Sequence, residues 1–251
     1  MAKEWFKSFF NNDYWLTYNF VDSKEKTNRE ARFIEKALKL NKNNKILDLC
    51  CGYGRHSIQL RKKGYNLFGY DLSPDLLKKA KIESGKQNAN FYLVRGDARN
   101  LSFQNRKFDK AFNFKTSFGY FKDSKEDYKL LEEVSRVLKP GGLLLLDTKN
   151  KNYVTKHLVP FEKIEINNVG VENRQRLDSK TGCIITERKM VFLDGRKKRY
   201  IVRNRFYTPK RLQKMLENAG FVVKTIYGSY AGEKFNTSSP RMIVIAKKVK
   251  R

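Results

Sequence analysis

The chain has 251 residues, of which 40% are hydrophobic and 13% aromatic, and its formal net charge is +28. This length and this hydrophobic content suit a large domain with a real core and exclude an intrinsically disordered protein. Three cysteines and two histidines, without a Cys-x-x-Cys pair, favour neither a disulfide framework nor a zinc cluster, so no metal is expected. No apolar run approaches the roughly 20 residues of a membrane span.

Residues 1–44 are predicted to form a helical segment ahead of the core. The spacings Trp5/Phe9 and Tyr14/Tyr18 fit one face of a helix. Such a helix either packs on the core or forms a lid over a pocket, where the tyrosine hydroxyls would be available. Acidic residues interrupt the segment and it has no small-residue cleavage site, so no signal peptide is predicted and a cytoplasmic location is expected.

Residues 45–150 are predicted to form a core of alternating strands and helices. The order β-α-β-α-β-β-α-β, with continuous apolar strands, indicates a parallel sheet covered by helices. The expected strands are 45–49, 66–70, 91–95, 108–114 and 143–147, and the expected helices are 55–63, 74–84 and 125–138. Ser73 and Pro74 provide a cap and a first residue for the second of these helices.

The pattern changes after residue 150. Alternating polar and apolar residues, with turns at Thr181-Gly182 and Asp194-Gly195, predict an antiparallel β meander within residues 151–207, which would roof the substrate. Residues 208–251 return to the core with a helix and two strands that can pair antiparallel. The predicted fold is a doubly wound α/β, Rossmann-like sheet of seven strands with an antiparallel last strand, a β insert after strand 5 and an N-terminal helical lid.

The chemistry is expected at the carboxyl ends of the strands. Residues 45–60 combine a buried strand, Asp48, a turn with Gly52 and Gly54, and a helix, an arrangement that presents backbone N–H groups to a ligand. In a doubly wound sheet such strand ends meet at the switch point, where ligands bind. Asp71 and Asp97 end or follow the next two strands, so the three acids are predicted to converge.

These acids favour a nucleoside cofactor. Asp71 can accept hydrogen bonds from both hydroxyls of a ribose. Asp97 can accept from an adenine amino group, with the N–H of Ala98 facing a ring nitrogen. A dehydrogenase is excluded because Ser57 stands where the third glycine of its motif belongs, and because Asp97 has no standard task with a nicotinamide dinucleotide.

The chain resembles class I S-adenosylmethionine-dependent methyltransferases, and most of all the small-molecule branch that includes glycine and sugar N-methyltransferases. Six motifs occur in the family's order: KILDLCCGYGRHSIQL, GYDLSP, RGDARNL, KFDKAFNFKTSFGYF, VLKPGGLLLLD and FYTPKRLQKMLENAGF. The resemblance covers most of residues 45–150 and 205–247. Tyr53 and Cys50 depart from the family's frequent Thr and Gly, but the backbone of this loop is what binds.

The resemblance implies S-adenosylmethionine as cofactor and assigns residues to its parts. Asp48, Cys51, Gly52 and Gly54 would line the methionine part, Asp71 and Leu72 the ribose and adenine, Asp97 and Ala98 the adenine edge, and Asn113 the surroundings of the sulfonium. Methyl transfer would be an in-line displacement, for which positioning in a dry pocket supplies much of the rate.

No catalytic residue stands out from the sequence. The candidates near the predicted pocket are Tyr14, Tyr18, His56 and Tyr120, which could serve a hydroxyl acceptor as a base. A neutral amine acceptor needs no base. His56 follows the glycine loop directly, which favours a structural or cofactor-side role over a catalytic one.

The acceptor is expected to be a nitrogen or oxygen on a small molecule. Asn113-Phe-Lys-Thr stands where enzymes that methylate DNA amino groups have Asp/Asn-Pro-Pro-aromatic, and the three cysteines lie in the cofactor loop or in the insert, which argues against thiolate attack. Four arginines of the meander could hold an anionic substrate or could form a solvated face. They are Arg174, Arg176, Arg203 and Arg205.

Two alternatives remain open. The net charge of +28 is compatible with methylation of RNA or a ribosomal component, or it reflects composition alone, since lysine and arginine are spread along the chain. A non-catalytic protein that binds S-adenosylmethionine is the third possibility. No membrane partner is expected.

Overall fold

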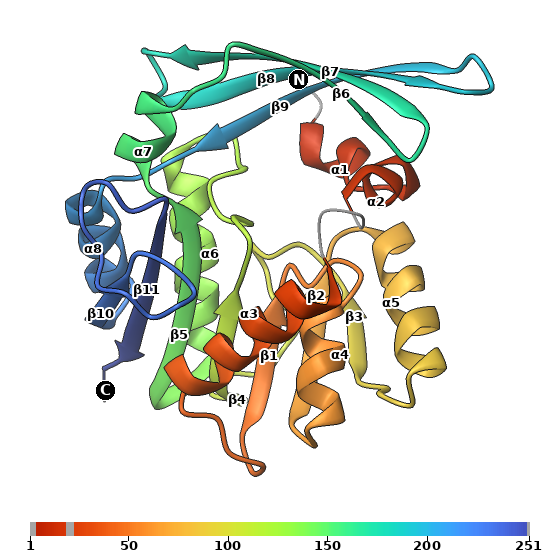
Figure 1. Cartoon of the computed structure of the whole chain (residues 1–251). Coiled ribbons are helices and arrows are strands. Elements are labelled where there is room, and N and C mark those ends of the chain that lie inside the picture. The colour runs from red at the N-terminus through yellow and green to blue at the C-terminus, as the bar shows by residue number, and fades with distance from the viewer. Residues whose placement is uncertain (1–3, 19–22, 250–251) are drawn as a thin grey trace.

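The computed structural model describes residues 4–18 and 23–249 (Figure 1). The main body is a seven-stranded sheet of β1 (Lys45–Leu49), β2 (Asn66–Asp71), β3 (Tyr92–Arg95), β4 (Phe108–Asn113), β5 (Leu138–Lys149), β10 (Phe221–Tyr227) and β11 (Arg241–Lys248). Its strand order is β10-β11-β5-β4-β1-β2-β3, and only β11 runs antiparallel to its neighbours. The predicted seven-stranded sheet with an antiparallel last strand is confirmed.

Helices cover both faces of this sheet. They are α3 (Lys24–Ala37) and α4 (Arg55–Lys62) on one face, α6 (Ser124–Val137) and α8 (Pro209–Asn218) on the other, and α5 (Pro74–Lys86) beside β3. Successive residues of a strand point to opposite faces, so Ile46 packs in the cluster with α3 and α4, while Leu47 packs in the cluster with α6 and α8. Within the described residues, no helix is long and apolar enough to cross a membrane.

Two local features differ from the sequence-based expectations. A short helix, α7 (Lys151–Lys156), follows β5 where no helix is predicted, and it begins where the side chain of Asn150 accepts from the N–H of Asn152. This helix buries no residue, so it has no apolar stripe that a pattern could reveal. Residues 139–142, predicted as a stop between helix and strand, belong to β5 and bulge between its pairings with Phe108 and Lys110.

A second sheet crosses above the carboxyl ends of the core strands (Figure 1). It consists of β6 (Phe161–Ile166), β7 (Val169–Asp178), β8 (Cys183–Phe192) and β9 (Lys197–Arg205), antiparallel in that order. We call this sheet the roof. It meets the core at Gly119, whose carbonyl accepts from the N–H of Arg205 at 2.8 Å. The predicted antiparallel insert after the fifth strand is confirmed.

Two short helices, α1 (Trp5–Phe9) and α2 (Asn12–Tyr18), lie between the roof and the core (Figure 1). We call them the lid; residues 1–3 and 19–22 of the predicted N-terminal segment lie outside the described residues. Trp5 Nε1 donates to the carbonyl of Tyr120 at 3.2 Å on the core side. Asn11 Nδ2 donates to the hydroxyl of Tyr200 at 3.1 Å on the roof side. The lid is therefore bound to both layers.

Candidate active site

A cavity of ≈ 1030 Å³ lies where the core, the lid and the roof meet. One half is lined by the loops that follow β1, β2 and β3. The other half is lined by the aromatic side chains of the lid, by residues after β4 and β5, and by one face of the roof. The fold thus joins the carboxyl ends of the core strands with the lid and the roof around one cavity.

The loop after β1 turns sharply at the cavity wall. Cys50, Gly52 and Gly54 have φ values of 59°, 55° and 74°, in the left-handed region that glycine tolerates best. Cys51 and Gly52, which were assigned to the methionine part of the cofactor, line the cavity. Gly54 lies behind them as the N-cap of α4, where an added Cβ would come 2.7 Å from Cζ of Phe91. Gly54 therefore shapes the loop and does not line the cavity.

The two cysteines of this loop are thiols, not thiolates. Burial and the neighbouring carboxylates Asp48 and Asp71 raise the pKa of both Cys50 and Cys51 well above the ordinary range. A nucleophilic cysteine needs the opposite environment. Both residues are partly buried and line the cavity.

Asp48 lies at the end of β1 and is 3% exposed. The hydroxyl of Ser57 donates to its Oδ2 at 2.6 Å, which ties the acid to the first turn of α4. Burial and the negative charge of Asp71 raise the pKa of Asp48 to about 7, against the hydrogen bond from Ser57 and the charge of Arg55. Two carboxyl groups that disfavour each other's charge at a cavity wall suit a cationic ligand.

Asp71 fastens two neighbouring segments at the end of β2. Its Oδ2 accepts from the N–H of Gly52 and its Oδ1 from the N–H of Ser73, both at 2.8 Å. Burial raises the pKa of this carboxyl group despite these hydrogen bonds. Each carboxylate oxygen can accept a second bond, so Asp71 retains the capacity to bind hydroxyls in the cavity that it lines beside Leu72.

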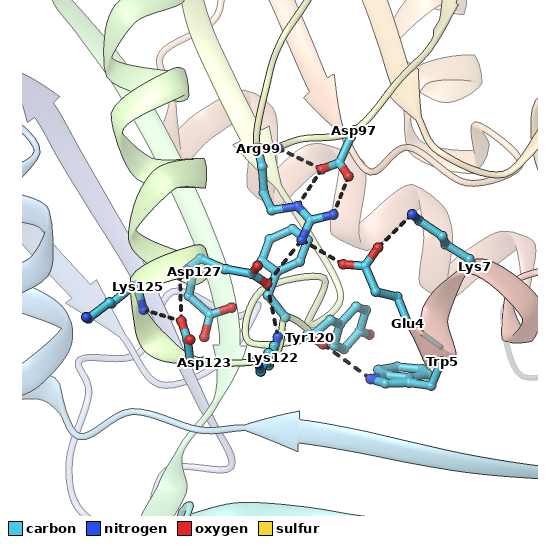
Figure 2. A network of polar contacts seen from close by, with 12 residues as sticks. Glu4, Trp5, Lys7, Asp97, Arg99, Tyr120, Lys122, Asp123, Lys125 and Asp127 are labelled. Carbon is cyan, nitrogen blue, oxygen red and sulfur yellow. Dashed lines mark hydrogen bonds and ion pairs between the residues drawn. The ribbon is translucent and has the colours of Figure 1, made fainter. Parts of the chain in front are cut away.

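Asp97 lines the cavity beside Ala98, but its carboxylate is already engaged (Figure 2). Arg99 donates to it from Nε at 3.0 Å and from Nη2 at 2.6 Å. Burial opposes ionisation of Asp97, but the hydrogen bonds and charge of Arg99 prevail and hold its pKa below the usual range. Nη1 of Arg99 also pairs with Glu4 of the lid at 2.7 Å and with Glu126 of α6 at 3.0 Å. One guanidinium thus joins the third strand end to the lid.

Asn113, predicted near the sulfonium, does not line the cavity. It is fully buried at the end of β4, and its Nδ2 donates to the carbonyl of Leu49 at 3.0 Å. Its Oδ1 has no hydrogen-bond partner among the described residues. Asn113 therefore joins the ends of β1 and β4 from behind the wall.

Three of the four candidate catalytic residues lie in the half of the cavity that the lid and the roof line. Tyr14 and Tyr18 of the lid stack with ring centroids 4.4 Å apart, and both line the cavity with Tyr120. Burial raises the pKa of Tyr120. The predicted lid tyrosines therefore face the same space as the residue after β4.

His56 reaches the cavity wall but belongs to a buried ion cluster. Its Nε2 lies 2.9 Å from Oε2 of Glu30, a carboxylate with no exposed surface. Arg55 and Lys115 pair with the same carboxylate, at 2.7 Å and 3.1 Å. These partners hold the pKa of Glu30 well below its ordinary value, against the cost of burial. The geometry agrees with the structural role favoured from the sequence.

The face of the roof that lines the cavity was not identified from the sequence. It presents mostly neutral polar and apolar side chains, namely Asn173, Gln175, Ile184, Thr186, Val202 and Asn204, together with Glu162 and Arg188. Arg188 is 4% exposed, and the parity of β8 places it on the same face as Thr186. Alternation could have grouped Arg188 with Thr186, but its burial against the core is not encoded in the local pattern.

The four roof arginines proposed as substrate ligands do not line the cavity. Arg174, Arg176 and Arg203 border a shallow depression elsewhere on the roof. Arg205 pairs with the buried Asp127 at 2.9 Å and so joins the roof to α6. Of the two possibilities left open from the sequence, the solvated face applies to Arg174, Arg176 and Arg203, which are exposed. Periodicity alone could not decide this, because it does not reveal which face of a two-sided sheet meets the core.

Part of the chain is similar in sequence to known methyltransferases. Residues 46–142 match the family model of a methyltransferase domain. A demethylmenaquinone methyltransferase of Staphylococcus carnosus is 35% identical over 114 residues, which cover 44% of this chain and 45% of that protein. A putative methyltransferase, YqeM, of Bacillus subtilis is 34% identical over 108 residues, 43% of each chain. The match spans under half the length of these two relatives.

Solved structures share the fold over nearly the whole chain. A S-adenosylmethionine-dependent methyltransferase from Clostridium acetobutylicum has a TM-score of 0.80 at 22% identity, covering 95% of this chain and 98% of that chain. The CcbJ methyltransferase from Streptomyces caelestis has a TM-score of 0.76 at 19% identity, covering 89% and 90%. Residues 46–142 of this chain are therefore similar to a methyltransferase domain, and the chain as a whole has the fold of these solved methyltransferases.

Proposed function

We propose that the chain binds S-adenosylmethionine at the strand ends and transfers its methyl group to a nitrogen or oxygen of a small molecule held under the roof. The observation that carries this proposal is one cavity shared by Asp48, Asp71 and Asp97 and by the lid and roof. A methyl donor and its acceptor must meet in a single enclosed space, because the displacement requires both in line.

The residues at the strand ends fit the proposed cofactor. Burial raises the pKa of both Asp48 and Asp71, and the charge of Asp71 raises that of Asp48 further, so a ligand with ammonium and sulfonium charges would favour their ionised forms. Asp71 keeps acceptor capacity for ribose hydroxyls, and Asp97 with Ala98 lines the expected adenine end. The bound cofactor supplies an electrophilic methyl group.

The remaining work of the chain is to position the acceptor and exclude water. Trp5, Phe9 and Phe10 of the lid line the cavity with Tyr14 and Tyr18, which limits water in the acceptor half. A neutral amine would attack without a base. For a hydroxyl acceptor, the phenol oxygens of Tyr14, Tyr18 and Tyr120 are the available proton acceptors. Burial raises the pKa of Tyr120, so this residue stays a neutral phenol.

Calorimetry with S-adenosylhomocysteine and S-adenosylmethionine tests cofactor binding. We expect binding at micromolar concentration and a loss of about 1–3 kcal/mol, about 5- to 150-fold in Kd, on Asp71→Ala. Absence of binding by the wild-type protein would rule out the enzyme and the non-catalytic binding protein together. Binding without turnover of any acceptor would favour the non-catalytic alternative.

Release of S-adenosylhomocysteine from an acceptor panel tests the transfer. The panel contains small amines and alcohols, ribosomal RNA, and demethylmenaquinone, the compound named in the matched relatives. We expect methylation of an amine or alcohol. Methylation of RNA alone would support the alternative suggested by the net charge of +28, and methylation of the quinone would replace nitrogen or oxygen by carbon as the acceptor atom.

A further inference from the structure

We propose that the acceptor carries an acidic group, a carboxylate or a phosphate, that pairs with Arg188 on the inner face of the roof. This inference rests on the proposed methyl transfer and adds the chemical class of the acceptor. Arginine presents a planar fork of donors that matches both anions, so the two sources share one recognition chemistry.

Arg188 is buried, and none of the residues that the structure describes forms an ion pair with it. Nη1 donates to the hydroxyl of Tyr18, and the guanidinium carbon lies 4.7 Å from the centroid of the same ring. Nε has no hydrogen-bond partner among the described residues, although Arg188 is only 4% exposed. A buried guanidinium has five N–H donors and a charge that is costly to desolvate unless an anion compensates it.

Two of the other cations at the cavity wall have their own carboxylates. Arg241 pairs with Asp147 at 2.6 Å, and Lys115 pairs with Glu30 at 3.1 Å. The described residues provide no such carboxylate within 4.0 Å of Arg188. The charge of Arg188 is therefore available to a ligand, whereas the charges of Arg241 and Lys115 are neutralised within the protein.

The neighbours of Arg188 within the roof keep acids away from it. Asn173 lies directly opposite on β7 and Tyr200 directly opposite on β9. Glu162 of β6 lies opposite Asn173, one strand further from Arg188 and about 9–10 Å away from it by strand spacing. Its carboxylate accepts a hydrogen bond from Nδ2 of Asn173 at 3.0 Å. Asn173 thus occupies Glu162 and separates it from the guanidinium, which leaves Arg188 facing the cavity with neutral neighbours.

The stack formed by Tyr14, Tyr18 and Arg188 gives the acid a fixed place. The two tyrosine rings lie 4.4 Å apart and the guanidinium covers the second ring, so lid and roof together hold the orientation of Arg188. A pre-positioned guanidinium loses little freedom when it binds an anion. An acid held there would leave the rest of the acceptor to extend toward the glycine loop.

Matched acceptor pairs test the inference: α-amino acids against their amides, and sugar phosphates against the free sugars. We expect wild-type protein to prefer the acid of at least one pair in kcat/KM. Arg188→Met should reduce kcat/KM for the acid by about 30-fold or more and leave the neutral partner within about threefold. For a pair without turnover, both members are titrated into the S-adenosylhomocysteine complex, and the acid should bind more tightly.

The matched control is Arg203→Met, which removes an arginine of the roof away from the cavity and should change neither member of a pair. Arg188→Lys should retain part of the preference. Equal use or equal binding of acid and neutral partner by the wild-type protein would overturn the inference. Equal loss for both partners in Arg188→Met and in Tyr18→Phe would instead make Arg188 a support of the lid. Affinity for S-adenosylhomocysteine should be unchanged in Arg188→Met; if the wild-type protein itself fails to bind it, the proposed function falls.

Discussion

Replacing Asp48 by asparagine should stabilise the cofactor-free protein at pH 8 and weaken its affinity for S-adenosylmethionine. Asparagine has nearly the same shape, and its oxygen can still accept the hydrogen bond that Ser57 donates at 2.6 Å. The substitution removes the charge that burial and Asp71 disfavour, since they raise the pKa of Asp48 from 3.8 to about 7. It also removes the charge that a cationic cofactor would meet.

The size of the effect follows from linkage. The difference between 3.8 and about 7 is about three pH units, which at 1.36 kcal/mol each amounts to about 4 kcal/mol. The folded protein binds this proton more tightly than the unfolded chain, so the contribution is fully present below pH 3.8 and is lost as pH rises through about 7. With relaxation of the charged state, we expect Asp48→Asn to be about 1–4 kcal/mol more stable than wild type at pH 8 and equally stable near pH 4.

Urea unfolding at pH 4, 6 and 8 measures this difference, and calorimetry measures affinity for S-adenosylmethionine at pH 6 and 8. Wild-type affinity should rise with pH across this range as Asp48 ionises, while the variant stays weaker and nearly flat. Asp194→Asn, in an exposed turn of the roof, is the control and should change neither property. A variant that is less stable than wild type at pH 8 would refute the reasoning.

Three further substitutions test the contacts that join the roof and the lid to the core. Gly119→Ala would place a Cβ 2.1 Å from the carbonyl oxygen of Arg205 and so displace the roof. The KM for the acceptor should therefore rise, while the calorimetric affinity for S-adenosylhomocysteine stays the same. An unchanged KM would contradict this reasoning. Arg205→Met leaves Asp127 buried without its cation, with only the hydrogen bond from the hydroxyl of Tyr207, and urea unfolding should show a loss of about 3–5 kcal/mol. A loss below about 1 kcal/mol would count against the ion pair. Arg99→Met removes the ion pairs of Arg99 with Glu4 and Asp97. The substitution should speed proteolysis within residues 4–18 and weaken cofactor binding. Equal cleavage of the variant and the wild type would show that other contacts hold the lid.

The parts of the fold that depend on neighbouring residues could be predicted from the sequence. Ser73 accepts from the N–H of Leu76 and Thr208 from the N–H of Arg211, so both helix starts lie where capping residues indicated. The strand, glycine turn and helix at residues 45–60 form as expected. In each case the signal and the contact lie within a few residues.

The parts of the site that depend on distant contacts could not be predicted. Asp97 was expected to meet adenine alone, yet Arg99 brings Glu4 to the same place across 95 residues of sequence, a contact that no local pattern encodes. Arg188 and Arg174 belong to strands with similar alternation. Alternation tells which residues share a face of the sheet, but it does not tell which face meets the cavity. Only the docking of the roof on the core distinguishes them.

The contact between Asn11 of the lid and Tyr200 of the roof can form only late in the synthesis of the chain. The two residues are 189 positions apart, so at 5–20 residues per second the lid waits about 10–40 s for its partner strand to be made. Trp5, Phe6, Phe9 and Phe10 face water, or a chaperone, throughout that delay. The apolar surface that later keeps water out of the cavity is therefore the surface most exposed to misassociation while the chain is still growing.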